Sequence, residues 1–160
     1  MTDPQHQRRG RKIAMSKAEL DDFLAGERTC RVATMSPLGP HVTPLWYVWD
    51  GSAIWLTSVV RSQRWTDLRA DPRVAIVVDA GEQYDDLRGA ELRGSVAIIG
   101  EVPRTSAIDE RVAGAELLFA RKYMSGNSMH HDGRHAWLRL VPEQIVSWDY
   151  RKIGRPPSFA

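Results

Sequence analysis

The amino-acid sequence predicts a mainly β protein, a six-stranded antiparallel barrel with a few flanking helices. Several short segments are rich in β-branched and aromatic residues and alternate between apolar and polar positions, a pattern typical of strands. Glycine, proline and aspartate separate these segments and mark tight turns. Most connections are too short for the helical crossovers of a parallel sheet, so the strands are expected to form antiparallel meanders.

Length, charge and cysteine content indicate a single domain without disulfides and without the strong positive charge of a nucleic-acid-binding protein. The 160 residues fit one domain, and their net charge of +2 is too small to make nucleic acid an expected partner. The single cysteine, Cys30, excludes an intrachain disulfide and is expected to be a small core residue. No apolar run reaches the length of a membrane span, and the N-terminus has no secretory leader pattern. A cytoplasmic protein is therefore expected.

The two ends of the chain are expected to lie outside the barrel domain, which we place over residues 16–153. Residues 1–15 are predicted to form a disordered basic tail, and a nucleic-acid or anionic-surface arm is the alternative. The basic residues of this tail are Arg8, Arg9, Arg11 and Lys12. Residues 154–160 are expected to form a C-terminal tail that either packs on a partner subunit or stays loose.

The first half of the domain is expected to begin with a helix and continue as a meander. Ser16 and Glu19 have the spacing of a capping box, which predicts a helix over 16–25. Strands are predicted over 29–36, 41–49 and 53–58. Pro37 to Pro40 forms the first turn, and Asp50-Gly51 is the pair that favours a type I′ hairpin.

The second half starts with a change to helical spacing over 61–70, which Asp71-Pro72 ends. Strands are predicted over 73–80 and 87–101, separated by an acidic loop. Pro103 is expected to open a helix that extends to about Met124, with Ile108 and Leu117 among its apolar residues. A loop over 125–134 then precedes two final strands over 136–141 and 144–150.

One stretch points to binding of an anion. A strand ends at Thr57-Ser58 and a helix begins near Ser62, where free backbone N–H groups favour negative charge. Arg61 and Arg64 lie around this helix start, and a guanidinium group binds phosphate through two hydrogen bonds. The alternative is a capped surface helix with solvated arginines. Motifs for a protein nucleophile are absent, so a bound cofactor is expected to supply any chemistry.

The order of these motifs resembles the pyridoxamine 5′-phosphate oxidase-like family, the flavin and deazaflavin oxidoreductases with an FMN-binding split β-barrel. The resemblance runs from Val42-Thr43-Pro44 through Thr57-Ser58 and Ser62-Gln63-Arg64 to Asp71-Pro72-Arg73-Val74-Ala75, and it covers roughly residues 18–152. The ending from Ser147 to Lys152 resembles actinobacterial members of the deazaflavin-using branch.

This resemblance implies positions for a cofactor. The strand at Val42 would run beside the flavin ring, and Thr57 and Ser58 would contact the ring and its ribityl chain. Ser62 and Arg64 would hold the phosphate, whereas Gln63 stands where the vitamin-making oxidases carry arginine, and Arg61 is expected to supply the missing charge. The cofactor-binding residues expected in full are Val42, Thr43, Pro44, Thr57, Ser58, Arg61, Ser62, Gln63, Arg64 and Trp148.

The resemblance further implies an oxidoreductase that transfers a hydride between a flavin-type cofactor and a small conjugated or aromatic acceptor. Coenzyme F-420 is the preferred cofactor and FMN the alternative, because of Gln63 and the C-terminal ending. The acidic tail of F-420 would need basic contacts, from Lys12 or Arg151. A homodimer with the cofactor at the subunit interface is implied, and no residue is nominated as an acid or base.

Other functions remain open at this stage. One is a non-catalytic module that binds a flavin or deazaflavin, and another is a haem-binding barrel that uses a histidine from His130, His131 or His135. The same histidines also fit a polar lid or a plain surface loop, and their spacing does not predict a metal site. Trp46, Trp49 and Trp148 fit either a dimer interface or core packing. The C-terminal end of the sequence does not carry the tryptophan and Arg-Leu-x-Pro pattern found there in true vitamin B6 oxidases, so pyridoxamine phosphate is not an expected substrate.

Overall fold

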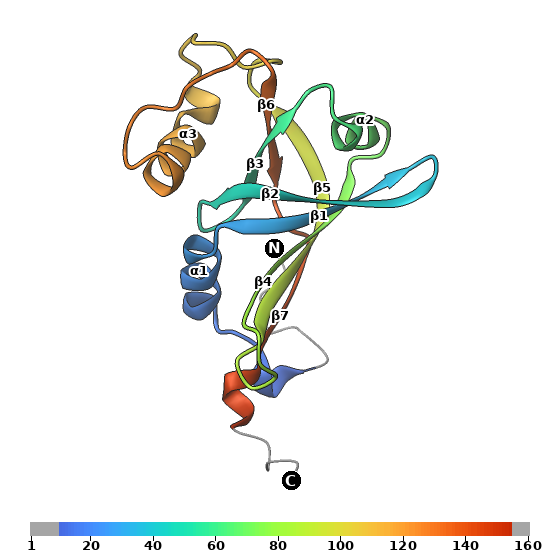
Figure 1. The fold of residues 1–160 in the computed structure, drawn as a ribbon, viewed down its shortest axis with the longest axis vertical. Helices are drawn as coiled ribbons and strands as arrows, with labels where there is room; N and C mark the ends of the chain where they lie inside the picture. Colours follow the sequence, from blue (N-terminus) through green and yellow to red (C-terminus); the bar gives the residue numbers. More distant parts are fainter. Residues whose placement is uncertain (1–9, 155–160) are drawn as a thin grey trace.

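The computed structural model describes residues 10–154 of the chain, and Figure 1 shows a barrel with helices on its outside. The helices are η2 (Arg11–Ile13), α1 (Lys17–Gly26), α2 (Gln63–Ala70), α3 (Glu110–Tyr123) and η3 (Tyr150–Ile153). The strands are β1 (Thr29–Ser36), β2 (Gly39–Trp49), β3 (Ile54–Val59), β4 (Arg73–Ala80), β5 (Arg88–Ile99), β6 (His135–Leu140) and β7 (Gln144–Asp149).

Six of these strands close a barrel, as the sequence predicts. Their order is β4-β1-β2-β3-β6-β5, and the pairing of β4 with β5 completes the ring. All pairings are antiparallel. The long strand β5 divides its partners, because residues 88–95 pair with β4 and residues 96–99 pair with β6. The last strand, β7, extends the sheet beside the first part of β5.

The inner faces of the strands form the main core, because successive side chains of a strand alternate between its two faces. Cys30 and Val32 of β1 pack there with Ile76 of β4, and all three are buried. Burial raises the pKa of Cys30 to about 12, so this thiol is an inert core residue, as expected from its apolar surroundings.

A second apolar cluster lies outside the barrel, where α3 covers the outer face of β2, β3 and β6 (Figure 1). Trp55 of β3 and Trp137 of β6 meet edge to face, with ring centroids 6.4 Å apart. Phe119 of α3 packs edge-on against Trp137 at 5.8 Å. This cluster holds α3 against the sheet, and two of its members, Phe119 and Trp137, also line a cavity.

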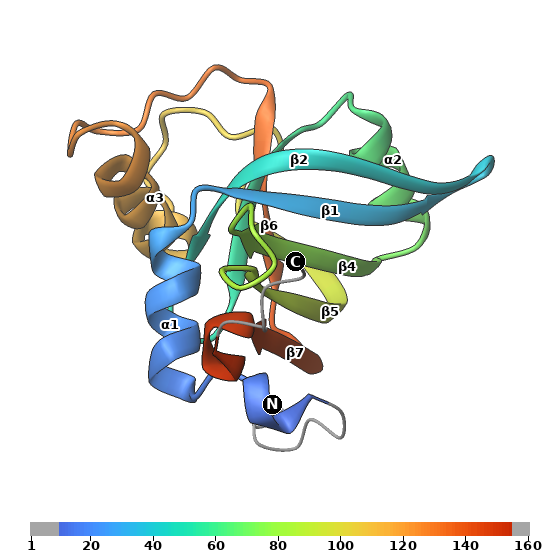
Figure 2. The same cartoon turned by 60° about the horizontal axis from the view of Figure 1, so that its bottom comes forward.

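The two ends of the described chain pack together below the barrel, where Figure 2 shows η2 and η3 next to each other. The backbone N–H of Met15 donates to Ser147 Oγ at 3.0 Å, and Lys152 Nζ donates to the Ala14 carbonyl at 2.7 Å. Residues 10–15 are therefore part of the folded domain, which begins earlier than the sequence boundary at residue 15 indicates. Residues 1–9 and 155–160, which hold the rest of both predicted tails, lie outside the described residues.

The helix predicted from Pro103 begins seven residues later than expected. Asp109 caps α3, and the segment before it is held in an irregular path because Glu101 accepts hydrogen bonds from both the N–H and the hydroxyl of Thr105. Leu117 is exposed because α3 buries a different face, and Ile108 is exposed in the segment before the helix begins.

Of the two roles left open for Trp49, core packing applies, because its side chain is buried and its indole N–H donates to Asp21 at 2.8 Å. Within the described residues, no helix combines the length and the apolar character needed to cross a membrane.

Gly89 of β5 provides a test of the sheet packing. A Cβ atom at this position would lie against the Trp148 ring and 2.8 Å from the Val78 carbonyl oxygen, so the Gly89→Ala substitution forces a shift in β4 or β7. We expect the substitution to lower the free energy of unfolding by about 1–3 kcal/mol. The control is Gly114→Ala in α3, where nothing lies within 4 Å and alanine should stabilise the helix by roughly 0.5–1 kcal/mol. Urea denaturation measures both, and equal stability of the two variants would contradict this packing.

Candidate functional site

The corner between β3 and α2 has the form that the sequence predicts. Ser62 has an extended backbone, with φ −76° and ψ 156°, and its hydroxyl accepts the N–H of Trp65 at 3.2 Å. This is an N-cap, which fixes the first turn of α2 and directs the positive end of the helix dipole into the corner.

Arg64 follows Ser62 in the first turn of α2 and is buried, with 7% of its surface exposed. Its Nε donates to Ser58 Oγ at 3.3 Å, and its Nη1 donates to Thr43 Oγ1. Burial lowers the pKa of the guanidinium, but an arginine side chain keeps its charge in proteins. No carboxylate of the described residues forms an ion pair with Arg64. A buried charge with only hydroxyl partners is costly, and an anion at this corner would offset that cost.

Three of the residues predicted to bind a cofactor therefore meet on the inner side of the barrel wall. Thr43 of β2 lies opposite Val32 of the core, and Ser58 of β3 is fully buried. Both hydroxyls contact Arg64. We call Thr43, Ser58, Ser62 and Arg64 the anchor corner.

Three other predicted residues lie on the opposite faces of the same strands. Pro44 and Thr57 line a cavity on the outside of the barrel, and Val42 is exposed by 57%. The alternation of side chains along β2 and β3 places these residues one position away from the anchor corner and on the other face. The predicted set is thus divided between an inner polar corner and an outer cavity.

The remaining residues predicted to bind the cofactor lie outside both the anchor corner and the cavity. Arg61 is exposed at the turn into α2. Gln63 is engaged within α2, where its Nε2 donates to Asp67 Oδ1 at 2.7 Å. Trp148 lies on β7 against Gly89, and Figures 1 and 2 both place β7 at the end of the barrel away from α2. Within one chain, the structure does not bring Trp148 to the anchor corner.

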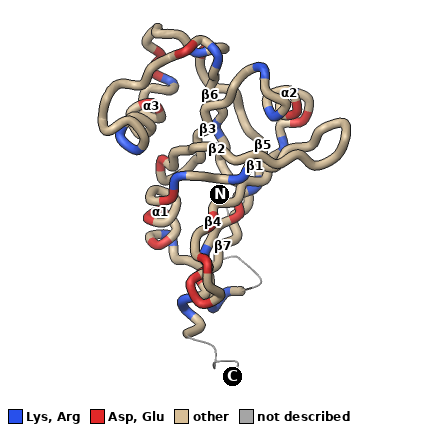
Figure 3. The backbone as a smooth tube through the Cα atoms, in the orientation of Figure 1, with Lys and Arg blue, Asp and Glu red and all other residues tan. Residues whose placement is uncertain are grey.

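The basic residues expected to meet an acidic cofactor tail also lie at the far end. Lys12 belongs to η2 and Arg151 to η3, at the opposite end of the molecule from α2 (Figures 1 and 3). Arg151 is already paired with Asp149, at 2.7 Å. Neither residue reaches the anchor corner of its own chain.

Asp67 is a buried carboxylate beside the anchor corner that sequence analysis missed. It accepts hydrogen bonds from Thr34 Oγ1 at 2.8 Å, His41 Nδ1 at 3.0 Å and Gln63 Nε2 at 2.7 Å. Burial acts to raise the pKa of Asp67, but these hydrogen bonds outweigh burial and lower it, so the group is ionised. Asp67 ties α2 to β1 and β2 and keeps Gln63 occupied. Only the i, i+4 spacing of Gln63 and Asp67 was visible in the sequence.

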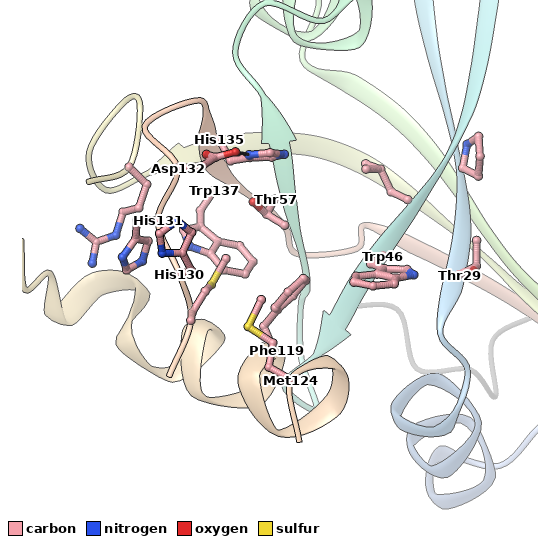
Figure 4. Close-up of a pocket in the computed structure, with 14 residues that line it drawn as sticks. Thr29, Trp46, Thr57, Phe119, Met124, His130, His131, Asp132, His135 and Trp137 are labelled. Atoms are coloured by element: carbon pink, nitrogen blue, oxygen red, sulfur yellow. Dashed lines mark hydrogen bonds and ion pairs between the residues drawn. The ribbon is translucent and has the colours of Figure 1, made fainter. Parts of the chain in front are cut away.

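A cavity of about 560 Å³ lies outside the barrel, between β2, β3, β6, α3 and the loop over 125–134. Figure 4 shows its side chains converging from these elements. Its apolar walls are Trp46, Phe119, Met124, Met129 and Trp137. Trp46 is half-exposed and stacks on Tyr123, with ring centroids 4.5 Å apart and planes within 8°. Such a volume with aromatic walls suits a planar organic ring.

The floor of the cavity is held by Glu116 of α3. Arg104 binds both carboxylate oxygens of Glu116, at 2.7 and 3.2 Å. His131 Nε2 and Trp137 Nε1 contact the same carboxylate, at 2.9 and 3.3 Å. Burial acts to raise the pKa of Glu116, but the hydrogen bonds, led by that from Arg104, lower it. This network fixes the loop over 125–134 against α3 and orients the Trp137 indole.

The rim of the cavity carries a second histidine–carboxylate pair. His135 Nδ1 lies 3.0 and 2.9 Å from the two oxygens of Asp132, and Figure 4 shows the pair above Thr57. All three histidines singled out in the sequence line the cavity. The described residues contain no cluster of three His, Cys, Asp or Glu side chains placed to hold a metal ion.

A protein family and several solved structures are similar to this chain. The family model described as pyridoxamine 5′-phosphate oxidase matches residues 16–149. The crystal structure of a conserved hypothetical protein from Mycobacterium tuberculosis is 33% identical, with a TM-score of 0.78 and 96% of each chain covered. No curated protein sequence matches this chain.

Two more distant structures share the fold. An F-420 reductase is 23% identical, with a TM-score of 0.59, and the match covers 78% of this chain and 94% of that one. A haem storage protein from Vibrio cholerae is 17% identical, with a TM-score of 0.63, and the match covers 84% of this chain and 96% of that one. The family match over most of the domain, together with the barrel and its strand order, shows that this chain belongs to the pyridoxamine 5′-phosphate oxidase family.

Proposed function

We propose that the protein is an oxidoreductase that transfers a hydride between a flavin-type cofactor and a small conjugated or aromatic acceptor. The observation that carries this proposal is Arg64, a buried guanidinium that contacts two hydroxyls and pairs with no carboxylate of the described residues. Ser62 and the N-terminus of α2 add donors at the same corner. Together these groups fit the phosphate of a flavin-type cofactor.

The outer cavity suits the ring of the same cofactor. Thr57 and Pro44 line the cavity, and each is the chain neighbour of an anchor residue, Ser58 and Thr43. A cofactor that extends from the anchor corner to the outer cavity would thus place its phosphate at the corner and its ring in the cavity. The aromatic walls orient a planar ring and exclude water, and the bound cofactor supplies the hydride chemistry.

We prefer coenzyme F-420 over FMN as the cofactor. Gln63 is neutral where the vitamin-making oxidases carry arginine, and Asp67 holds its amide. Arg61 is an exposed cation beside the corner and suits an acidic extension beyond the phosphate. The fold shared with an F-420 reductase is compatible with this preference.

The substitution Arg64→Met tests the anchor directly. It removes the charge but keeps a similar length, and we expect it to weaken FMN and F-420 binding by about 10-fold to 100-fold, the loss of a charged hydrogen bond. Binding of riboflavin, which has the same ring as FMN but no phosphate, should be unchanged. The control is Arg69→Met, an exposed arginine of the same helix. Fluorescence titration of each purified variant measures these affinities.

Two results would contradict the proposal. One is an Arg64→Met variant that keeps the wild-type ratio of FMN to riboflavin affinity, which would place the phosphate elsewhere. The other is a wild-type protein that binds neither cofactor. Tight binding without turnover of any acceptor would instead favour the non-catalytic binding module.

We further propose that the protein is a homodimer with the cofactor at the subunit interface. Exposed apolar residues gather on β1, β2 and their hairpin, and an apolar surface of this kind is typical of a protein interface. They are Met35, Leu38, Val42 and Trp46. Sedimentation equilibrium should give a mass near twice 18.1 kDa for the wild-type chain. A mass equal to one chain, with and without cofactor, would contradict the dimer.

Haem binding is the second candidate, because three histidines line the aromatic cavity. His131 contacts Glu116 and His135 contacts Asp132, whereas His130 has no carboxylate partner among the described residues, so His130 is the better axial ligand. Haem added to the purified protein should then produce a Soret band that His130→Ala removes and His41→Ala retains. Absence of the band in the wild-type protein would exclude this candidate.

A further inference from the structure

The three histidines of the cavity differ in what holds them. His131 is bound through Nε2 to Glu116, a carboxylate already engaged by Arg104, and therefore belongs to the cavity floor. His130 has no charged partner among the described residues. His135 contacts both oxygens of Asp132 through Nδ1, at 3.0 and 2.9 Å, and no other contact of its ring is seen in the described part of the chain. Its Nε2 is thus free to meet a ligand.

The backbone places His135 firmly. It is the first residue of β6, and its Cα lies opposite that of Val59 at the end of β3. Its carbonyl accepts the N–H of Arg104 at 2.6 Å. The side chain is 35% exposed at the rim, where Figure 4 shows it near Thr57. The ring therefore lies between the cavity and water, which suits a group that exchanges protons with both.

The charge at Asp132 determines the chemistry of this ring. The hydrogen bond from His135, together with those from Arg134, holds the pKa of Asp132 well below its usual range, so the carboxylate is ionised. An ionised carboxylate only accepts, so Nδ1 carries a hydrogen. The neutral ring then presents a lone pair at Nε2, and the imidazolium presents an N–H there.

We propose that His135 donates and accepts a proton at the acceptor bound in this cavity, and that Asp132 is the residue that positions it. This inference rests on the proposed oxidoreductase function and adds a catalytic residue that the sequence did not nominate. A neutral Nε2 accepts the proton in the oxidative direction, and the imidazolium donates it in the reductive direction.

The reductive step balances for an α,β-unsaturated carbonyl acceptor. A hydride, with its electron pair, passes from the reduced cofactor to the β-carbon and breaks the C=C π bond. The α-carbon takes the proton of His135 Nε2–H, whose N–H bond breaks as the new C–H bond forms. The acceptor is reduced and the cofactor oxidised by two electrons, and water at the rim returns a proton to the imidazole.

The other charged groups around His135 are compatible with this role. Arg134 also contacts Asp132, with its Nε 3.2 Å from Oδ2, but its side chain points mainly into solvent. The positive charge of Arg104 is offset by Glu116 and Glu101. His130 and His131 are the remaining titratable groups of the cavity, and Glu116 faces the latter.

Binding of 4-nitrophenol tests the dyad without any cofactor. This planar phenol becomes coloured when it ionises, so its absorbance reports whether the bound form is phenol or phenolate. An imidazolium at His135 should favour bound phenolate, and His135→Gln should weaken phenolate binding by about 10-fold to 100-fold. Asp132→Asn should lower the bound phenolate fraction. His130→Gln, which makes the same substitution at another histidine of the cavity and leaves the dyad intact, is the matched control.

A second experiment measures the rate at which an acceptor oxidises the reduced, cofactor-loaded protein in a single turnover. We expect His135→Gln to slow acceptor reduction by about 10²-fold to 10⁴-fold, with unchanged cofactor affinity and an unchanged melting temperature. Equal phenolate binding by wild type and His135→Gln, or equal rates with the same cofactor bound, would overturn the role of His135. A wild-type protein that binds phenolate through His135 but no flavin-type cofactor would instead overturn the proposed function.

Discussion

The buried positive charge of Arg64 is the constraint on which the account of the site depends. A guanidinium held against Thr43 and Ser58, without a carboxylate partner among residues 10–154, is stable only because the surrounding fold fixes it there. The N-cap at Ser62 fixes the start of α2, and Asp67 ties the same helix to β1 and β2. These contacts fix the corner in the absence of a ligand, which is what the proposed phosphate site requires.

The alternation of side chains along β2 and β3 explains how adjacent residues of each strand reach both the anchor corner and the aromatic cavity. Thr43 and Ser58 face the anchor corner, whereas Pro44 and Thr57 face the aromatic cavity. A ligand with a charged group at one end and a flat ring at the other matches this division. The same division explains why α3, far along the chain, is needed: it supplies the outer wall that the barrel lacks.

Local patterns in the sequence predicted much of the fold because their physics is local. The capping box at Ser16 and the N-cap at Ser62 involve residues only three positions apart, and both are present. Pro103 was misleading because proline permits a helix start but does not require one, and Glu101 instead binds Thr105. Asp67 and Glu116 could not be recognised as site residues, since their partners His41 and Arg104 lie many positions away and meet them only after folding. The partners of Asp132 are local, at positions 134 and 135, but the cavity that this loop borders is formed by strands and a helix that meet only in the folded chain.

A crystal structure of the protein with F-420 or FMN bound would test the central claim most directly. We predict a phosphate group within hydrogen-bond distance of the Arg64 guanidinium and the Ser62 hydroxyl, with the ring over Thr57. A corner without phosphate, or one in which an acidic side chain of the protein fills that place, would contradict the account.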